Sequence, residues 1–212
     1  QGTVGWIMVA SGLVDEPRVA PIKLGLHLLL AFAVFCLLLW TRWQVQSEPR
    51  YPAHKNLALG ARYTMALLVI QIFFGALVAG LRAGLTYNTY PLMDGQLIPD
   101  GLHLMQPWWL NHLESVLTVQ FQHRMGALLV AATVLLFAWR ARRIERFRRI
   151  SRHLTIIVTA QFALGVATLL SGVHLWLASA HQLLALALLA LLVRAIYLVP
   201  LDTNQRHLKL MT

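Results

Sequence analysis

The chain has 212 residues, of which 58% are hydrophobic and 12% charged, and it carries a net charge of +10 at pH 7. Soluble domains contain about 25% charged residues, so this composition excludes an ordinary soluble protein. The basic excess does not indicate a nucleic-acid-binding protein, because the positive charges lie in short segments between apolar runs, as in membrane proteins. The single cysteine, Cys36, excludes a disulfide framework and a thiolate metal site.

Long apolar segments dominate the chain and predict an all-α integral membrane protein, an antiparallel bundle of transmembrane helices. Each can cross a hydrocarbon core of about 30 Å with its backbone hydrogen bonds closed internally. A shorter apolar stretch at residues 1–13 cannot span a bilayer, and we expect the chain to begin inside a helix that starts upstream. The predicted spans are about residues 23–40, 63–81, 116–139, 154–173 and 176–199.

The charges of the loops predict the orientation of the bundle. The 41–62 and 140–152 segments are rich in Lys and Arg, so both should be cytoplasmic. The long 82–115 segment has Arg82 as its only Lys or Arg and contains Trp108 and Trp109, which suit the opposite membrane interface. A loop of this length in a compact bundle is usually functional. We interpret it as a lid over a bound cofactor, with a plain connector as the alternative.

An internal repeat indicates two similar helical halves. Gln1, Gly5, Ser11 and Gly12 recur at identical spacing as Gln161, Gly165, Ser171 and Gly172, and a histidine-led helix follows each copy. Gln71 and Gly75 repeat the Gln-x-x-x-Gly step once more. We therefore expect four parts: 1–41, the end of one helix plus the last transmembrane helix of an N-terminal half; 42–62, a cytoplasmic loop; 63–199, a complete four-helix C-terminal half with the outer loop 82–115; and 200–212, a cytoplasmic tail.

Three histidines, His27, His123 and His181, lie inside predicted spans. Their positions place all three within roughly 6–11 Å of the same membrane surface at 1.5 Å rise per residue. A buried histidine can simply hydrogen-bond between helices, but three at one depth favour metal ligation, most naturally of haem iron. A zinc site is disfavoured, because no Cys, Asp or Glu accompanies these residues within the helices.

Two neighbours of His123 bear on a haem site. Arg124 lies at the same depth, where its guanidinium could pair with a haem propionate or extend to the outer interface. Gln120 lies three residues before His123 on nearly the same helix face. Its amide can donate a hydrogen bond but cannot act as a general base.

The chain resembles the haem A synthase family of bacterial and mitochondrial respiratory chains over nearly its whole length. The resemblance rests on five motifs together: Gln1-Gly2-x-x-Gly5-Trp6-x-Met8-Val9-x-Ser11-Gly12-Leu13, Val78-Ala79-Gly80-Leu81-Arg82-Ala83-Gly84, Asn88-Thr89-x-Pro91-Leu92-Met93-x-Gly95, Thr118-Val119-Gln120-Phe121-Gln122-His123-Arg124, and Leu164-Gly165-x-x-Thr168-Leu169-Leu170 leading to His181-Gln182.

The resemblance implies an eight-helix protein of two four-helix halves, each with a pair of histidines facing a haem pocket on the outer side. His123 and His181 would be the axial iron ligands of a b-type haem (haem b), with Arg124 and Gln120 beside it. His27 would be a catalytic iron ligand at the site where the substrate haem O is oxidised. There a ring methyl becomes the formyl group of haem A, which is destined for cytochrome oxidase.

The resemblance also implies a setting. The expected location is the bacterial inner membrane with the haem sites toward the periplasm, or the mitochondrial inner membrane in a eukaryote. Expected partners are the lipid bilayer, a haem O synthase and an electron donor, with a homo-oligomer as a further option and no nucleic acid. The family's first helices, with the partner of His27 and a catalytic glutamate, have no counterpart here, so we expect these 212 residues alone to be inactive.

Two other functions fit the histidines. A bis-histidine cytochrome could act only as an electron carrier, although such carriers usually place haems at two depths. A transporter or assembly scaffold could use the histidines for hydrogen bonds between helices. Absorption typical of haem and consumption of haem O distinguish the three.

Overall fold

The computed structural model describes residues 1–10, 20–51 and 55–200. Ser11 and Gly12 of the repeat, residues 52–54 of the predicted cytoplasmic loop, and the predicted tail beyond Pro200 lie outside the described residues. The described helices are α1 (Gly2–Ala10), α2 (Pro21–Val45), α3 (Lys55–Gly80), α4 (Asn111–Glu114), α5 (Val116–Ala141), α6 (Arg148–Leu170) and α7 (Leu175–Leu198). Short 3₁₀ turns occupy Ala83–Leu85, Trp108–Leu110 and Glu145–Phe147.

Five of these helices are long and apolar enough to cross a membrane, which confirms the predicted spans and the all-α membrane fold. Two of them begin earlier than the apolar pattern predicts. α3 starts at Lys55 rather than near residue 63, and α6 starts at Arg148 rather than near 154. Lys and Arg are good helix formers, so the helices continue past the end of their apolar runs into the basic segments.

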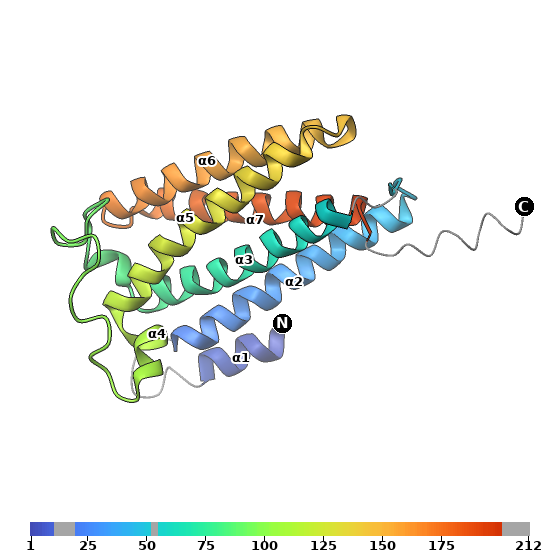
Figure 1. The fold of residues 1–212 in the computed structure, drawn as a ribbon. Helices are drawn as coiled ribbons and strands as arrows, with labels where there is room; N and C mark the ends of the chain where they lie inside the picture. The colour runs from blue at the N-terminus through green and yellow to red at the C-terminus, as the bar shows by residue number, and fades with distance from the viewer. Residues whose placement is uncertain (11–19, 52–54, 201–212) are drawn as a thin grey trace, which may run out of the picture.

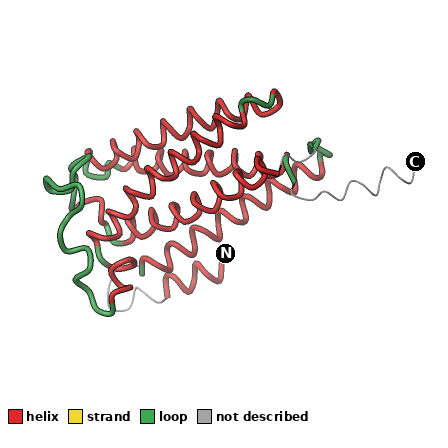
Figure 2. The backbone as a smooth tube through the Cα atoms, in the orientation of Figure 1, coloured by secondary structure: helices red, strands yellow, loops and turns green. Residues whose placement is uncertain are grey.

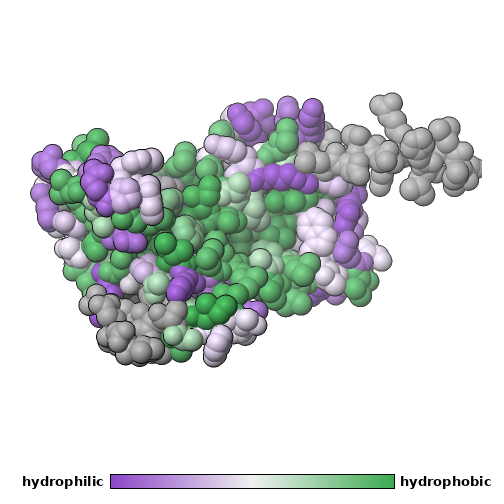
Figure 3. Space-filling model, turned by 90° about the horizontal axis from the view of Figure 1, so that it is seen from below, coloured by the Kyte–Doolittle hydropathy of each residue, from purple (hydrophilic) through white to green (hydrophobic). Residues whose placement is uncertain are grey.

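The helices form one antiparallel bundle (Figure 1). α3 packs against α5, α5 against α6, and α6 against α7, while α3 also contacts α7. α2 packs along α3 and α7, and α1 packs along α2. The long loop between α3 and α5 lies at one end, and the α2–α3 and α5–α6 connections lie at the other (Figure 2). The space-filling view shows a largely hydrophobic middle with hydrophilic residues gathered mainly toward the two ends (Figure 3).

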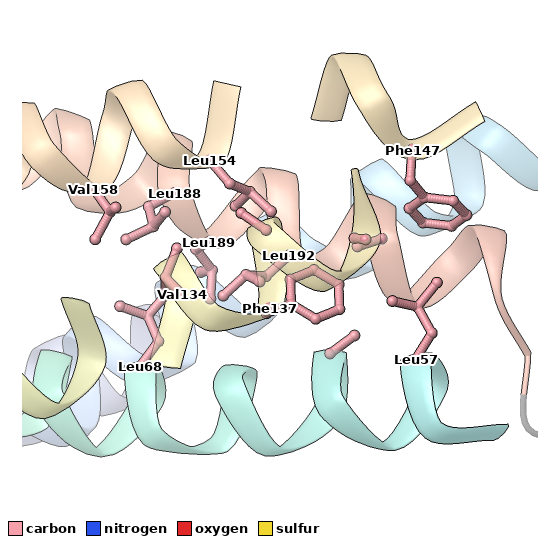
Figure 4. Packing of buried hydrophobic residues seen from close by; sticks show 14 of the residues in the cluster. Leu57, Leu68, Val134, Phe137, Phe147, Leu154, Val158, Leu188, Leu189 and Leu192 are labelled. Atoms are coloured by element: carbon pink, nitrogen blue, oxygen red, sulfur yellow. The ribbon is translucent and has the colours of Figure 1, made fainter. Parts of the chain in front are cut away.

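The main cluster of buried apolar residues lies in the half of the bundle near the basic segments, with fewer buried apolar residues, such as Leu77 and Val119, in the outer half. The main cluster includes Leu68, Val134, Leu154, Leu188 and Leu192, whose side chains meet between α3, α5, α6 and α7 (Figure 4). Toward the outer loop the α6–α7 pair is different. α6 has no buried residue after Val158, and α7 has none before Leu188. The outer halves of these two helices are therefore not packed into a core of their own.

The outer loop is ordered by polar side chains that bond to its own backbone. Asn111 is fully buried, and its amide bonds to the backbone N–H and carbonyl of Met105 and to the carbonyl of Trp108. Thr118, in the first turn of α5, donates to the carbonyl of Leu102. Asn88 donates to the carbonyls of Gly84 and of Leu169 at the end of α6. The loop is thus tied to the outer ends of α5 and α6.

The asymmetry of the core predicts where truncation destabilises the bundle. Leu192 is 0% exposed and Leu37, on α2, is 64% exposed. Leu192→Ala should cost about 2–5 kcal/mol through lost burial and a residual cavity, whereas Leu37→Ala should change stability little. Thermal unfolding of both variants in detergent checks this, and equal losses would contradict the assigned core face of α7.

Candidate functional site

The three intramembrane histidines occupy matching positions near the outer end of the bundle. His27 is on α2, His123 on α5 and His181 on α7, each six or seven residues after the first residue of its helix. This corresponds to roughly 9–11 Å along the helix axis. All three helices start at the outer end, so the three imidazoles lie at a similar depth.

Each of these imidazoles meets the amide of a glutamine from an earlier part of the chain: Gln1 just before α1, Gln71 on α3 and Gln161 on α6. Gln71 on α3 places Nε2 3.0 Å from Nδ1 of His123 and donates to the His123 backbone carbonyl at 2.8 Å. Gln1 places Nε2 3.3 Å from Nε2 of His27 and 3.4 Å from its carbonyl. Gln161 on α6 places Nε2 3.4 Å from Nε2 of His181. The Gln-x-x-x-Gly step in the sequence was the signal for these glutamines, but nothing in it identifies their partners.

The histidine pair predicted to ligate one haem comes from two helices of the same bundle. Gln71 occupies Nδ1 of His123, so Nε2 is the nitrogen left for a ligand. Nδ1 of His181 is buried without a hydrogen-bond partner, as is Nδ1 of His27. Imidazole nitrogens with no protein partner fit a group that accepts nitrogen ligands, such as haem iron.

In the described part of the chain, no cluster of three or more His, Cys, Asp or Glu residues is arranged to hold a metal ion. A bis-histidine haem requires only two such ligands, because the porphyrin supplies the others. The donor set therefore fits a haem better than a free metal ion.

Arg124 fastens the outer loop to α5. It is 9% exposed, and its guanidinium donates to the carbonyls of Tyr87 at 2.7 Å, Thr89 at 2.8 Å and Leu92 at 3.4 Å. Gln120, one turn earlier, also donates to the carbonyl of Tyr87 at 3.1 Å. The two predicted cofactor-binding residues thus share a loop carbonyl, while Nε of Arg124 and Oε1 of Gln120 are buried without partners. Sequence reasoning offered a propionate or the interface for Arg124 and missed these carbonyls.

The other described histidines are not built into the bundle in this way. His112 bonds to Gln122 within the outer end, and it packs beside His103 and Trp108 in the loop. Arg194, near the inner end of α7, pairs with Glu48 at 2.9 Å. His54 and His207 lie outside the described residues.

The Arg124 contacts predict a localised effect of a conservative substitution. Lysine keeps the charge but lacks the planar fork that reaches several carbonyls. Losing hydrogen bonds to a charged group at about 1.5–3 kcal/mol each should speed amide exchange of residues 87–92 by roughly tenfold or more in Arg124→Lys. Hydrogen–deuterium exchange measures this, with Arg143→Lys at the opposite end as the control. Unchanged exchange in this segment would show that Arg124 does not hold the loop.

Comparison with known proteins identifies the family of the chain. Residues 1–193 match the model of a family described as cytochrome oxidase assembly protein. A protein of Methylobacterium nodulans named heme A synthase is 46% identical over 199 residues, covering 90% of this chain and 55% of that protein. A heme A synthase of Beijerinckia indica is 42% identical over 201 residues, covering 91% of this chain and 56% of the relative.

A further heme A synthase, from Rhodopseudomonas palustris strain HaA2, is 42% identical over 200 residues. The chain spans about half the length of these curated relatives. No solved structure matches it significantly. With the family model covering nearly the whole chain, this five-span helical bundle belongs to the cytochrome oxidase assembly protein family that includes the heme A synthases.

Proposed function

We propose that the protein is a haem A synthase, which oxidises a ring methyl of haem O to the formyl group of haem A for cytochrome oxidase. The proposal draws the activity from the names of its relatives. We further propose that His123 and His181 are the axial ligands of a b-type haem that stays in the bundle of α3, α5, α6 and α7. His27, on α2, then belongs to a separate site for the substrate haem O.

One observation supports the resident haem above the others. The imidazoles of His123 and His181 lie in the half of the bundle where the facing parts of α6 and α7 have no buried residue, although the other half is densely packed. A large apolar macrocycle suits such a region, since the partly buried apolar side chains of the outer α6–α7 segment are free to pack against it. Burial of that apolar area would add to the binding free energy beyond the two iron bonds.

The residues of the chain have distinct proposed roles at this haem. When bound, the haem would supply one-electron redox chemistry at its iron. His123 and His181 offer ring nitrogens from two helices, and the position of the haem follows from theirs. Arg124 and Gln120 hold residues 87–92 over the outer end of α5, which limits the access of water. The buried Nε of Arg124 remains available for a propionate.

The setting follows from the charges. With the basic segments 41–62 and 140–152 in the cytoplasm, the histidines lie toward the opposite face of the membrane. The relatives come from bacteria such as Methylobacterium nodulans and Beijerinckia indica, so we propose the bacterial inner membrane with the haems toward the periplasm. The chemistry requires a haem O synthase to provide the substrate and an electron donor for the haem. It also requires an oxidant and a source of the formyl oxygen atom, because converting a methyl to a formyl group removes four electrons and adds one oxygen.

Removing either axial ligand should abolish stable binding of the resident haem. In the intact protein purified from membranes, His123→Ala and His181→Ala should each lose the Soret spectrum of a six-coordinate, low-spin haem. His153→Ala, an exposed position on α6, should keep it. A wild-type protein without Soret absorption would overturn the haem proposal and favour a scaffold or transporter.

Removing His27 should separate the two sites. His27→Ala should retain the Soret spectrum of the resident haem while the amount of haem A formed from haem O falls to background, as measured by chromatography of extracted haems. Normal haem A formation would show that His27 does not serve the substrate site. Reversible electron transfer with no consumption of haem O by the wild type would instead support an electron carrier.

A further inference from the structure

Each of the three intramembrane histidines meets the glutamine and packs against the glycine of a Gln-x-x-x-Gly pair. The ring nitrogen that meets the amide is Nδ1 in His123 and Nε2 in His27 and His181. Glutamine and glycine four residues apart lie on one face of a helix, one turn from each other. Facing them, on the next long helix, is a histidine whose ring lies against the glycine and whose edge meets the glutamine amide. The three sets are Gln1, Gly5 and His27; Gln71, Gly75 and His123; and Gln161, Gly165 and His181.

The glycine is required because the imidazole occupies the space of a side chain. A Cβ added at Gly75 would lie 3.1 Å from Cε1 of His123, and one at Gly5 would lie 3.1 Å from Cε1 of His27. At Gly165 the corresponding distance to His181 is 2.9 Å. In each set the same ring atom is the nearest one, so the three rings meet their glycines in the same orientation.

Gln71, the glutamine of the central set, contacts His123 on one side and Gly126 on the other. Its amide nitrogen bonds to both Nδ1 and the backbone carbonyl of His123. Its carbonyl oxygen lies against Gly126, where a Cβ would be only 2.1 Å from Oε1. Any larger residue at position 126 would therefore displace Gln71. Oε1 itself is buried and has no hydrogen-bond partner.

This arrangement separates these three histidines from another that also meets a glutamine. Gln122 places its amide 2.8 Å from Nδ1 of His112. None of the described glycines has the His112 ring among its nearest atoms. The combination of amide and glycine thus coincides with the three histidines at one membrane depth.

We propose that Gln71 and Gly75 are positioning residues that set the rotation and tautomer of His123 as an iron ligand. In the other two sets the amide meets Nε2 instead, so the proposal is confined to His123. This rests on the proposed haem function. By occupying Nδ1, the amide directs Nε2 to the iron. If Nε2 bound the iron, Nδ1 would carry a proton. The amide of Gln71 would then turn over so that Oε1 accepts this proton, and its present hydrogen bond to the His123 carbonyl would be lost.

The amide therefore tunes the iron as well as orienting the ring. An acceptor at the distal nitrogen of a ligating histidine raises the basicity of the ligand and so stabilises the ferric state. Gln71→Leu removes that acceptor and should raise the midpoint potential of the haem. Gln71→Glu supplies a stronger acceptor and should lower it. A merely structural role for Gln71 would not shift the two variants in opposite directions.

The test uses the intact protein in detergent, with hemin titration, haem content and redox titration as readouts. Gln71→Leu should bind hemin about 10- to 100-fold more weakly, as expected for loss of an outer partner of a metal ligand. Gln122→Leu is the matched control and should match the wild type in both hemin affinity and potential. Thermal unfolding of every variant establishes that the compared proteins are folded.

The glycine is tested on the same helix. Gly75→Ala should weaken hemin binding, whereas Gly60→Ala on α3 should not, because a Cβ at Gly60 would meet Phe137 at an ordinary 3.5 Å. Equal hemin affinity in the two alanine variants would overturn the role of the glycine. Wild-type potentials in both Gln71→Leu and Gln71→Glu would overturn the role of the amide while leaving the haem proposal standing. A wild type that binds no hemin would overturn both proposals.

Discussion

A polar side chain inside a bilayer must find its partner within the protein, because the hydrocarbon offers none. This constraint organises the outer half of the bundle. The histidines are met by glutamine amides, and Arg124 is met by the carbonyls of a loop folded back over its helix. Few atoms are left over, and those that remain are mostly ring nitrogens and amide oxygens around the histidines. The unsatisfied groups thus mark the place where we propose that a ligand binds.

The two ends of the bundle differ: the inner half supplies most of the apolar packing, and the outer half contains the histidines. Stability comes from the inner half, where α3, α5, α6 and α7 bury a continuous apolar cluster. In the outer half, α6 has no buried residue after Val158 and α7 has none before Leu188. Polar contacts between side chains and the backbone are the main interactions there. A fully packed outer half would be more stable by itself and would leave no apolar surface for a macrocycle. The closely packed inner half holds the helix spacing that the outer half needs.

Much of this could be predicted from the sequence, because hydropathy and loop charge report on each helix separately. The five spans, the outer loop and the shared depth of the histidines follow from those patterns. The starts of α3 and α6 did not, because apolar periodicity ends before the helices do. Nor did the partners of Arg124, His123 and His181, because these contacts join residues 20 to 52 positions apart. The division into two halves and the haem-ligand roles remain predictions.

The glutamine and histidine of the three sets are separated by 26, 52 and 20 residues. The packing of the ring against the glycine is the same whether a short turn or the long outer loop connects the two helices. When the position of a histidine depends only on one helical turn packed against another, the length of the segment that joins the two helices does not affect it. The contact between each histidine and its glycine therefore does not depend on the outer loop, which is tied separately to α5 and α6 through the carbonyls of Tyr87, Thr89 and Leu102 and through Asn88.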